Sequence, residues 1–134
     1  MYQITEECTG CGMCRQWCPV KAIRGHKKKR HVIETSCISC GVCGRVCGYG
    51  AILDDTGCLT RRIPIRGWFK PVWDYLLCNG CGKCVAVCPV RCIQIIPLGE
   101  GVEKRPILAR PNLCIGCQFC KNACESRAIR APGG

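Results

Sequence analysis

Residues 8–18 read CTGCGMCRQWC, and the spacing of their four cysteines, C-x2-C-x2-C-x3-C, decides how the rest of the chain is interpreted. The same spacing occurs three more times within the 134 residues. The four runs contain Cys8, Cys11, Cys14 and Cys18; Cys37, Cys40, Cys43 and Cys47; Cys78, Cys81, Cys84 and Cys88; and Cys114, Cys117, Cys120 and Cys124. All but two of the 18 cysteines therefore belong to one repeated pattern.

So many cysteines indicate either disulfides or metal. No apolar stretch approaches the roughly 18 residues that a membrane helix requires, and no signal peptide is apparent. We therefore expect a cytoplasmic protein without membrane insertion. Because the cytosol keeps thiols reduced, a cysteine-rich chain in that compartment is expected to bind metal.

The spacing of the cysteines distinguishes two kinds of metal site. Structural zinc normally takes two C-x2-C pairs separated by a longer spacer, which supplies four tetrahedral ligands. Here the third and fourth cysteines follow too soon for that arrangement, whereas three thiolates two residues apart can wrap three irons of a 4Fe-4S cube. The pattern favours iron–sulfur clusters over the alternatives, a structural zinc-binding interaction module and a disulfide scaffold.

Glycines accompany the second cysteine of the runs. In such tight loops a side chain would obstruct a close approach or a positive φ angle, and the backbone N–H groups are expected to point at the sulfurs. The glycines in this register are Gly10, Gly12, Gly41, Gly80, Gly82 and Gly116.

A second repeat follows the last cysteine of each run, where a small residue and then isoleucine recur. These pairs are Ala22-Ile23, Ala51-Ile52, Cys92-Ile93 and Ala128-Ile129. Since Cys92 occupies the position of an alanine, we expect it to be a small buried residue and not a ligand. Cys58 lies outside both repeats and is expected to be a packed free thiol.

The first and third runs begin 70 residues apart, which indicates two tandem modules. We expect modules at 1–53 and 72–134 with a connector at 54–71. Apolar segments predict a hairpin from Ile23 to Ile33 and another from Ile93 to Leu108, with turns at 25–29 and 99–101. Short helices are expected to carry the third and fourth cysteines of each run.

In these residues the chain resembles the two-cluster bacterial-type ferredoxin family, twice over. The resemblance implies an α+β fold with four 4Fe-4S clusters, in which the last cysteine of each run serves the neighbouring cluster. The implied ligand sets are Cys8, Cys11, Cys14 and Cys47; Cys37, Cys40, Cys43 and Cys18; Cys78, Cys81, Cys84 and Cys124; and Cys114, Cys117, Cys120 and Cys88. Gly48 and Glu125 replace the proline that the family usually has after the last cysteine.

The formal net charge of +11 would by itself suggest nucleic acid or an anionic surface as partner. Four oxidised clusters with their thiolates would contribute about −8, which brings the chain to about +3, and full reduction brings it to about −1. The basic residues are therefore expected mainly to compensate the clusters, and no nucleic-acid partner is expected.

No catalytic triad, P-loop, dinucleotide fingerprint or open metal site is recognisable, so the chain is not expected to be an enzyme by itself. We expect an electron-transfer subunit of an oxidoreductase complex such as a hydrogenase, a formate dehydrogenase or an oxo-acid oxidoreductase. The segments YQIT (2–5), KRHVIE (29–34) and WFKPVWD (68–74) more narrowly resemble small polyferredoxin subunits of tungstopterin aldehyde ferredoxin oxidoreductase-family enzymes. That resemblance implies a tungsten-containing catalytic partner and a ferredoxin or flavin partner.

Aromatic residues gather around the connector. Trp68, Phe69 and Trp73 lie there in a chain with only eight aromatic residues. We expect these residues either to anchor a partner protein, as aromatic side chains do at interfaces, or to pack the modules.

Overall fold

The computed structural model describes residues 1–97, 99 and 103–130. The chain divides into two compact units, Met1–Trp68, called unit 1, and Phe69–Gly134, called unit 2. Residues 54–68, which the sequence assigns to a connector, belong to unit 1 in this division. The boundaries at 53 and 72 stay a prediction.

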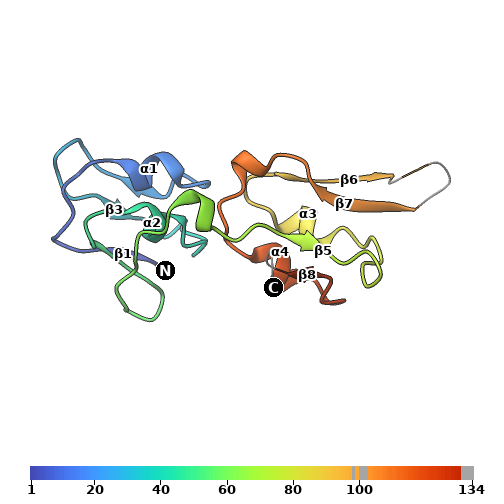
Figure 1. The fold of residues 1–134 in the computed structure, drawn as a ribbon. Coiled ribbons are helices and arrows are strands. Elements are labelled where there is room, and N and C mark those ends of the chain that lie inside the picture. The colour runs from blue at the N-terminus through green and yellow to red at the C-terminus, as the bar shows by residue number, and fades with distance from the viewer. Residues whose placement is uncertain (98, 100–102, 131–134) are drawn as a thin grey trace. The chain divides into compact units, whose positions relative to one another are not determined.

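Unit 1 is built from very short elements (Figure 1). In chain order they are β1 (Gln3–Ile4), α1 (Met13–Trp17), β2 (Ile23–Arg24), β3 (Val32–Ile33), α2 (Val42–Val46), β4 (Ile52–Leu53) and the 3-10 helix η1 (Ile65–Gly67). Strands β1 and β4 pair antiparallel, as do β2 and β3. The predicted hairpin is the β2–β3 pair, whereas the pairing of the first and last strands was not expected.

Unit 2 repeats this order of α-helices and strands, with longer hairpin strands and with its 3-10 helix before the second α-helix (Figure 1). Its elements are β5 (Val72–Trp73), α3 (Lys83–Val87), β6 (Ile93–Pro97), β7 (Lys104–Leu108), the 3-10 helix η2 (Pro111–Leu113), α4 (Phe119–Ala123) and β8 (Ile129–Arg130). Strands β5 and β8 pair antiparallel, as do β6 and β7. The predicted hairpin is again present, although most of its expected turn lies outside the described residues. The α+β class is confirmed.

The helices are five residues long, which is too short for a helix to be stable alone in water. Each contains the third cysteine of a run, and the fourth cysteine follows directly as its C-terminal cap in an extended conformation. The prediction that the helices carry both cysteines is therefore correct for the third cysteine only. The helices touch in pairs, α1 with α2 and α3 with α4, so packing holds them.

The core of each unit combines isoleucines with sulfur. Both members of every small-residue–isoleucine pair named above are at most 4% exposed, which confirms the repeat as a core motif. In unit 1, Ile4, Ile23, Ile33 and Ile52 pack with buried cysteines, and in unit 2 Trp73, Ile93 and Ile129 do the same. The core of both units therefore surrounds the cysteine runs.

Trp68 is part of the interior of unit 1. It is 5% exposed, its ring meets Trp17 edge to face at 5.0 Å, and its indole N–H donates to the Ile63 carbonyl at 2.7 Å. Trp73 is only 9% exposed in the core of unit 2. The expectation that Trp68 and Trp73 belong to a docking surface is wrong, because buried side chains cannot anchor a partner.

Candidate metal centres

Four cavities of nearly equal size lie among the cysteine runs. Each is lined by the first three cysteines of one run and the last cysteine of the other run of the same unit. Site A has Cys8, Cys11, Cys14 and Cys47; site B has Cys37, Cys40, Cys43 and Cys18; site C has Cys78, Cys81, Cys84 and Cys124; site D has Cys114, Cys117, Cys120 and Cys88. Their volumes are about 310 Å³ for site A and about 300 Å³ for each of the others.

The loops that hold the first three cysteines share one backbone conformation. All six glycines of the predicted register have positive φ, between 74° and 81°. In the two remaining places of the register, Ser39 (φ 58°) and Gln118 (φ 65°) adopt the same left-handed conformation. No sequence signal marked these two residues, because the usual marker of this conformation is glycine.

A close backbone approach fixes the first loop. A Cβ on Gly10 would lie 2.3 Å from the backbone nitrogen of Lys29, whereas a Cβ on Gly12 would meet no atom within 4 Å. Gly10 therefore allows the β2–β3 hairpin to lie directly against site A, while Gly12 only needs its positive φ.

Backbone N–H groups donate to the cysteine sulfurs, as the loops predicted. Gly10 donates to Cys8 Sγ at 3.4 Å, and Ser39 donates to Cys37 Sγ at 3.3 Å. The last cysteine of three runs accepts from the small residue four positions later: Ala22 to Cys18 at 3.2 Å, Cys92 to Cys88 at 3.4 Å, and Ala128 to Cys124 at 3.3 Å. Such contacts stabilise negative charge on sulfur.

Burial makes the third cysteines reluctant to ionise alone. It raises the pKa of Cys14 to about 11 and the pKa of both Cys43 and Cys120 to about 12, and it also raises the pKa of Cys84. A thiolate at these places therefore needs a nearby cation, which an iron would supply.

The cavities fit a cluster better than a single ion. Within the part of the chain that the structure describes, no three Cys, His, Asp or Glu side chains converge closely enough to hold one metal ion. The sulfurs instead line cavities whose empty space, including the part open to solvent, is about 300 Å³ each. An all-sulfur ligand set around such a volume suits the soft, multinuclear iron of a 4Fe-4S cluster.

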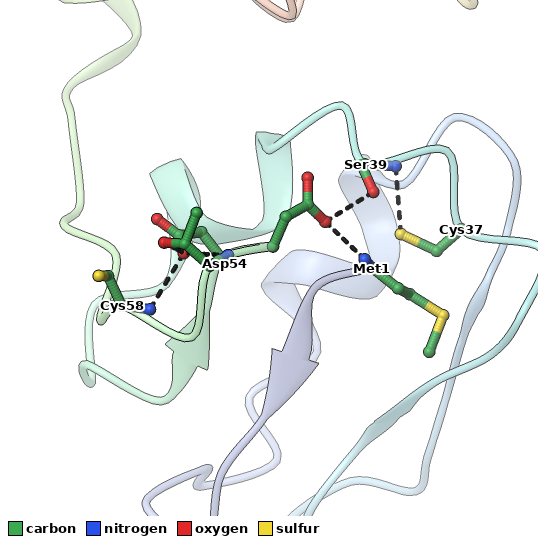
Figure 2. Close-up of polar contacts among 7 residues, drawn as sticks. Met1, Cys37, Ser39, Asp54 and Cys58 are labelled. Atoms are coloured by element: carbon green, nitrogen blue, oxygen red, sulfur yellow. Dashed lines mark hydrogen bonds and ion pairs between the residues drawn. The ribbon is translucent and has the colours of Figure 1, made fainter.

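A polar network supports the loop of site B (Figure 2). The Ser39 hydroxyl donates to Asp55 Oδ1 at 2.9 Å, and the Met1 ammonium pairs with the same oxygen at 2.5 Å. The Met1 ammonium and the Ser39 hydroxyl together lower the pKa of the Asp55 carboxyl. The network thus ties the start of the chain to the loop that carries Cys37.

Cys58 lies in the turn beside this network, where its backbone N–H donates to Asp54 Oδ1 at 3.0 Å (Figure 2). It is exposed, and it lines none of sites A to D. The expectation that Cys58 is packed is therefore wrong, and its being a free thiol stays a prediction.

Comparison with known protein families supports this site chemistry. A 4Fe-4S dicluster domain model matches residues 1–48, and two 4Fe-4S binding domain models match residues 71–94 and 111–127. An uncharacterised ferredoxin of Methanocaldococcus jannaschii, MJ0199, is 36% identical over 59 residues, which cover 42% of this chain and 86% of that protein. The chain belongs to the bacterial-type 4Fe-4S ferredoxin family.

The chain is also similar to longer proteins, which include a polyferredoxin. The polyferredoxin protein MvhB of Methanothermobacter marburgensis is 33% identical over 110 residues, 76% of this chain and 24% of that protein. An iron-sulfur subunit of the CoB–CoM heterodisulfide reductase of M. jannaschii is 35% identical over 68 residues, 42% of this chain and 10% of that protein. The chain thus spans a quarter or less of these two relatives. The chain therefore belongs with the tandem, polyferredoxin-type members of the family.

The ferredoxin and polyferredoxin relatives are electron carriers, which agrees with the expectation that the chain alone is not an enzyme. Within residues 1–97, 99 and 103–130, no helix has the length and apolar character that crossing a membrane requires.

Proposed function

We propose that the chain is a polyferredoxin subunit that holds four 4Fe-4S clusters, one in each of sites A to D, and relays single electrons. The observation that carries the proposal is the recurrence of one four-sulfur cavity in four places with nearly the same volume. The proposed ligands are the first three cysteines of one run and the last cysteine of the other run, as given above for each site, and Cys92, which also lines site D, is not among them. Each unit would then hold two clusters by crossed ligation, in which the last cysteine of a run serves the other site.

The chain's own residues supply the environment of the clusters. A bound cluster takes up or gives up one electron at a time. The apolar cores shield the third cysteine of each run from water, and backbone N–H groups donate to cysteine sulfurs and so stabilise the negative charge that arrives with an electron. The helix pairs α1–α2 and α3–α4 bring the two sites of a unit together.

We further propose a hetero-oligomeric setting in which a catalytic oxidoreductase subunit exchanges electrons with the chain, and a soluble ferredoxin or flavoprotein exchanges them at another point. The similarity to polyferredoxin and heterodisulfide reductase subunits supports an oxidoreductase complex. The catalytic partner is proposed to be a tungstopterin enzyme or another anaerobic oxidoreductase. Anaerobic co-purification, followed by identification of the companion protein and its metal, distinguishes these partners.

The cluster count tests the core of the proposal. Four ligands per site at four sites predict four clusters, hence about sixteen irons and sixteen inorganic sulfides per chain. A brown, anaerobically reconstituted sample with that content supports the proposal. A content below three clusters contradicts it, and a colourless protein with stoichiometric zinc favours the zinc-binding alternative.

A further inference from the structure

Unit 1 carries a large open groove with a basic lining. The groove has a volume of about 1340 Å³ and lies between α1 and the β2–β3 hairpin. Its lining includes four exposed basic side chains, Arg15, Lys21, Arg24 and Lys27, of which Arg24 forms an ion pair with Glu34. We call it the basic groove.

The basic groove adjoins site A directly. Cys11 and Gly12 line both the groove and the cavity of site A, and Cys11 is an exposed cysteine. A molecule seated in the groove would therefore touch a cysteine of site A. This position matters because electron tunnelling requires close approach between donor and acceptor.

Unit 2 carries mostly uncharged residues at the positions that correspond to the groove cations. With the repeat offset of 70, Val85, Gln94 and Pro97 stand where unit 1 has Arg15, Arg24 and Lys27. Ile95 replaces Gly25, and its Cδ1 lies only 3.3 Å from the position of a Cβ on Gly82. The same region of unit 2 thus has fewer cations and an isoleucine packed beside its loop.

We propose that the basic groove docks the acidic surface of a redox partner protein, and that site A is where electrons enter or leave the chain. The proposal rests on the proposed cluster function. In the entry direction, a reduced partner gives up one electron and is oxidised, and the cluster at site A gains that electron. Charge complementarity steers such encounters. No Phe, Tyr or Trp lines the groove, and the one ring in its lining, His31, is only 2% exposed, so the groove lacks the exposed stacking platforms that single-stranded nucleic acids use.

The test uses the full chain with its iron measured beforehand. Reduced flavodoxin, an acidic one-electron donor protein, serves as the probe in stopped-flow measurements at low and high salt. The groove variant is Arg15→Val/Arg24→Gln/Lys27→Gln, of which the first two substitutions introduce the unit 2 residues. The control variant, Arg61→Gln/Arg62→Gln/Arg66→Gln, removes the same charge from exposed positions of unit 1 that do not line the groove.

At low salt, we expect the second-order rate constant for reduction of the chain by flavodoxin to be about tenfold lower in the groove variant than in the wild type. In the control variant it should be lower by about twofold at most. High salt should remove most of the difference, because it screens exposed charges. Reduction by the small cation methyl viologen should not be slowed in either variant. If the triple variant loses iron, the single substitution Lys27→Glu replaces it.

Equal slowing in groove and control variants would overturn the proposal, because it would show a general effect of net charge. An unchanged flavodoxin rate together with groove-dependent binding of a single-stranded oligonucleotide would overturn it in favour of nucleic acid. A wild-type protein with fewer than three clusters would instead contradict the proposed function, and the iron count separates that failure from a failure of docking.

A second, independent observation concerns Cys92. This residue is 2% exposed and lines site D together with the four proposed ligands. Its Sγ lies 3.5 Å from Cys88 Sγ, and its backbone N–H donates to the same sulfur at 3.4 Å. The equivalent residues Ala22 and Ala128 make only the backbone contact.

We infer that the Cys92 thiol is a positioning residue that donates S–H to Cys88 and raises the reduction potential of the cluster in site D. An iron-bound sulfur carries no proton, so the hydrogen bond runs from Cys92 to Cys88. Hydrogen bonds to cluster sulfurs favour the more negative, reduced state. The Cys92 side chain also interacts with Cys114, a second proposed ligand of site D, so this site receives sulfur–sulfur contacts that alanine cannot provide at the other three sites.

Redox titrations followed by electron paramagnetic resonance test this role. In Cys92→Ala, we expect unchanged iron and one midpoint potential shifted downward, while Cys92→Ser, which retains a donor, keeps that midpoint near its original value. Unchanged potentials in Cys92→Ala would overturn the inference. Loss of one cluster's iron in Cys92→Ala would also overturn it, because Cys92 would then be a ligand.

Discussion

The two units build the same pair of four-sulfur cavities beside hairpins of different size. In unit 1 the hairpin strands β2 and β3 have two residues each, and in unit 2 strands β6 and β7 have five. The cysteine loops nevertheless keep positive φ angles at the same positions, and in both units a backbone N–H four residues after the last cysteine of a run donates to its sulfur. The cavities therefore depend on the loops and the Ala/Cys-Ile pairs, which leaves the hairpins free to give each unit its own surface.

The largest expected effect tests how closely each hairpin approaches its loop. In Gly10→Ala, the new Cβ would lie 2.3 Å from the Lys29 backbone nitrogen. We therefore expect the free energy of unfolding of unit 1 to fall by more than about 3 kcal/mol, and site A to lose its iron. Gly12→Ala, with similar φ but no neighbour within 4 Å, should cost about 1 to 2 kcal/mol. Denaturant titrations and iron analysis measure both.

The counterpart in unit 2 sharpens this comparison. In Gly80→Ala the nearest atom would be the Lys104 carbonyl oxygen at 2.8 Å, so the cost should lie between those of Gly10→Ala and Gly12→Ala. If the Gly10→Ala and Gly12→Ala variants prove equally stable, the close contact between the Gly10 loop and the β2–β3 hairpin does not contribute to the stability of site A.

A second prediction concerns the large buried aromatic of unit 1. Trp68→Ala should lower the free energy of unfolding of unit 1 by about 3 to 5 kcal/mol, because it removes the packing on Trp17 and the hydrogen bond to Ile63. Trp68→Phe keeps most of the packing and should cost less. Calorimetry of the full chain should show a lower melting temperature for unit 1 and an unchanged melting temperature for unit 2. An unchanged melting profile in Trp68→Ala would contradict the burial described for this residue.

The third prediction uses the residue that differs most between the hairpins. Ile95 is half-buried, and Ile95→Ala should destabilise unit 2 by about 1 to 2 kcal/mol through loss of its contact with the Gly82 loop. The exposed neighbour provides a control, because Gln94→Ala should change stability by about 0.5 kcal/mol or less. Equal effects of the two substitutions would show that Ile95 does not stabilise the loop.

The smallest expected effect is a dependence on pH in the turn after β4. Hydrogen bonds, first from the Thr56 hydroxyl and then from the Cys58 N–H, lower the pKa of the Asp54 carboxyl below its ordinary value. A carboxyl with a lowered folded pKa contributes stability above its unfolded pKa, and this contribution is lost as pH falls through the folded pKa. Asp54→Ala should therefore remove part of the acid-induced loss of stability in unit 1.

Denaturation by urea across the pH range in which the iron content stays constant measures this dependence. Thr56→Ala is the matched control, because it removes only the hydroxyl donor and should leave a weaker dependence than the wild type. Identical pH profiles for the wild type and Asp54→Ala would contradict the assignment.

The cysteine pattern predicted much of the local structure because each loop is determined by residues close in sequence. The six glycines, the small-residue–isoleucine pairs and both hairpins were all recognisable without the structure. The pairing of β1 with β4 was not, since a strand of two residues shows no periodicity. Ser39 and Gln118 adopt positive φ without glycine, because the surrounding loop imposes it.

Other features depend on contacts between distant residues and were therefore missed. Trp68 packs on Trp17, which lies far earlier in the chain, and aromatic content alone did not distinguish an exposed anchor from a packed side chain. The basic groove needs α1, the hairpin and the small Gly25 together. The sequence showed its cations only as scattered charges.

The central claim is that each unit holds two clusters by crossed ligation. It is tested most directly by a crystal structure of the anaerobically prepared protein, with anomalous scattering recorded at the iron edge. The account predicts four groups of iron peaks, with the sulfur of Cys47 bound at the site of Cys8, Cys11 and Cys14, and that of Cys18 bound at the site of Cys37, Cys40 and Cys43. Cys47 bound instead to the cluster of its own run, or fewer than four groups of peaks, would contradict it.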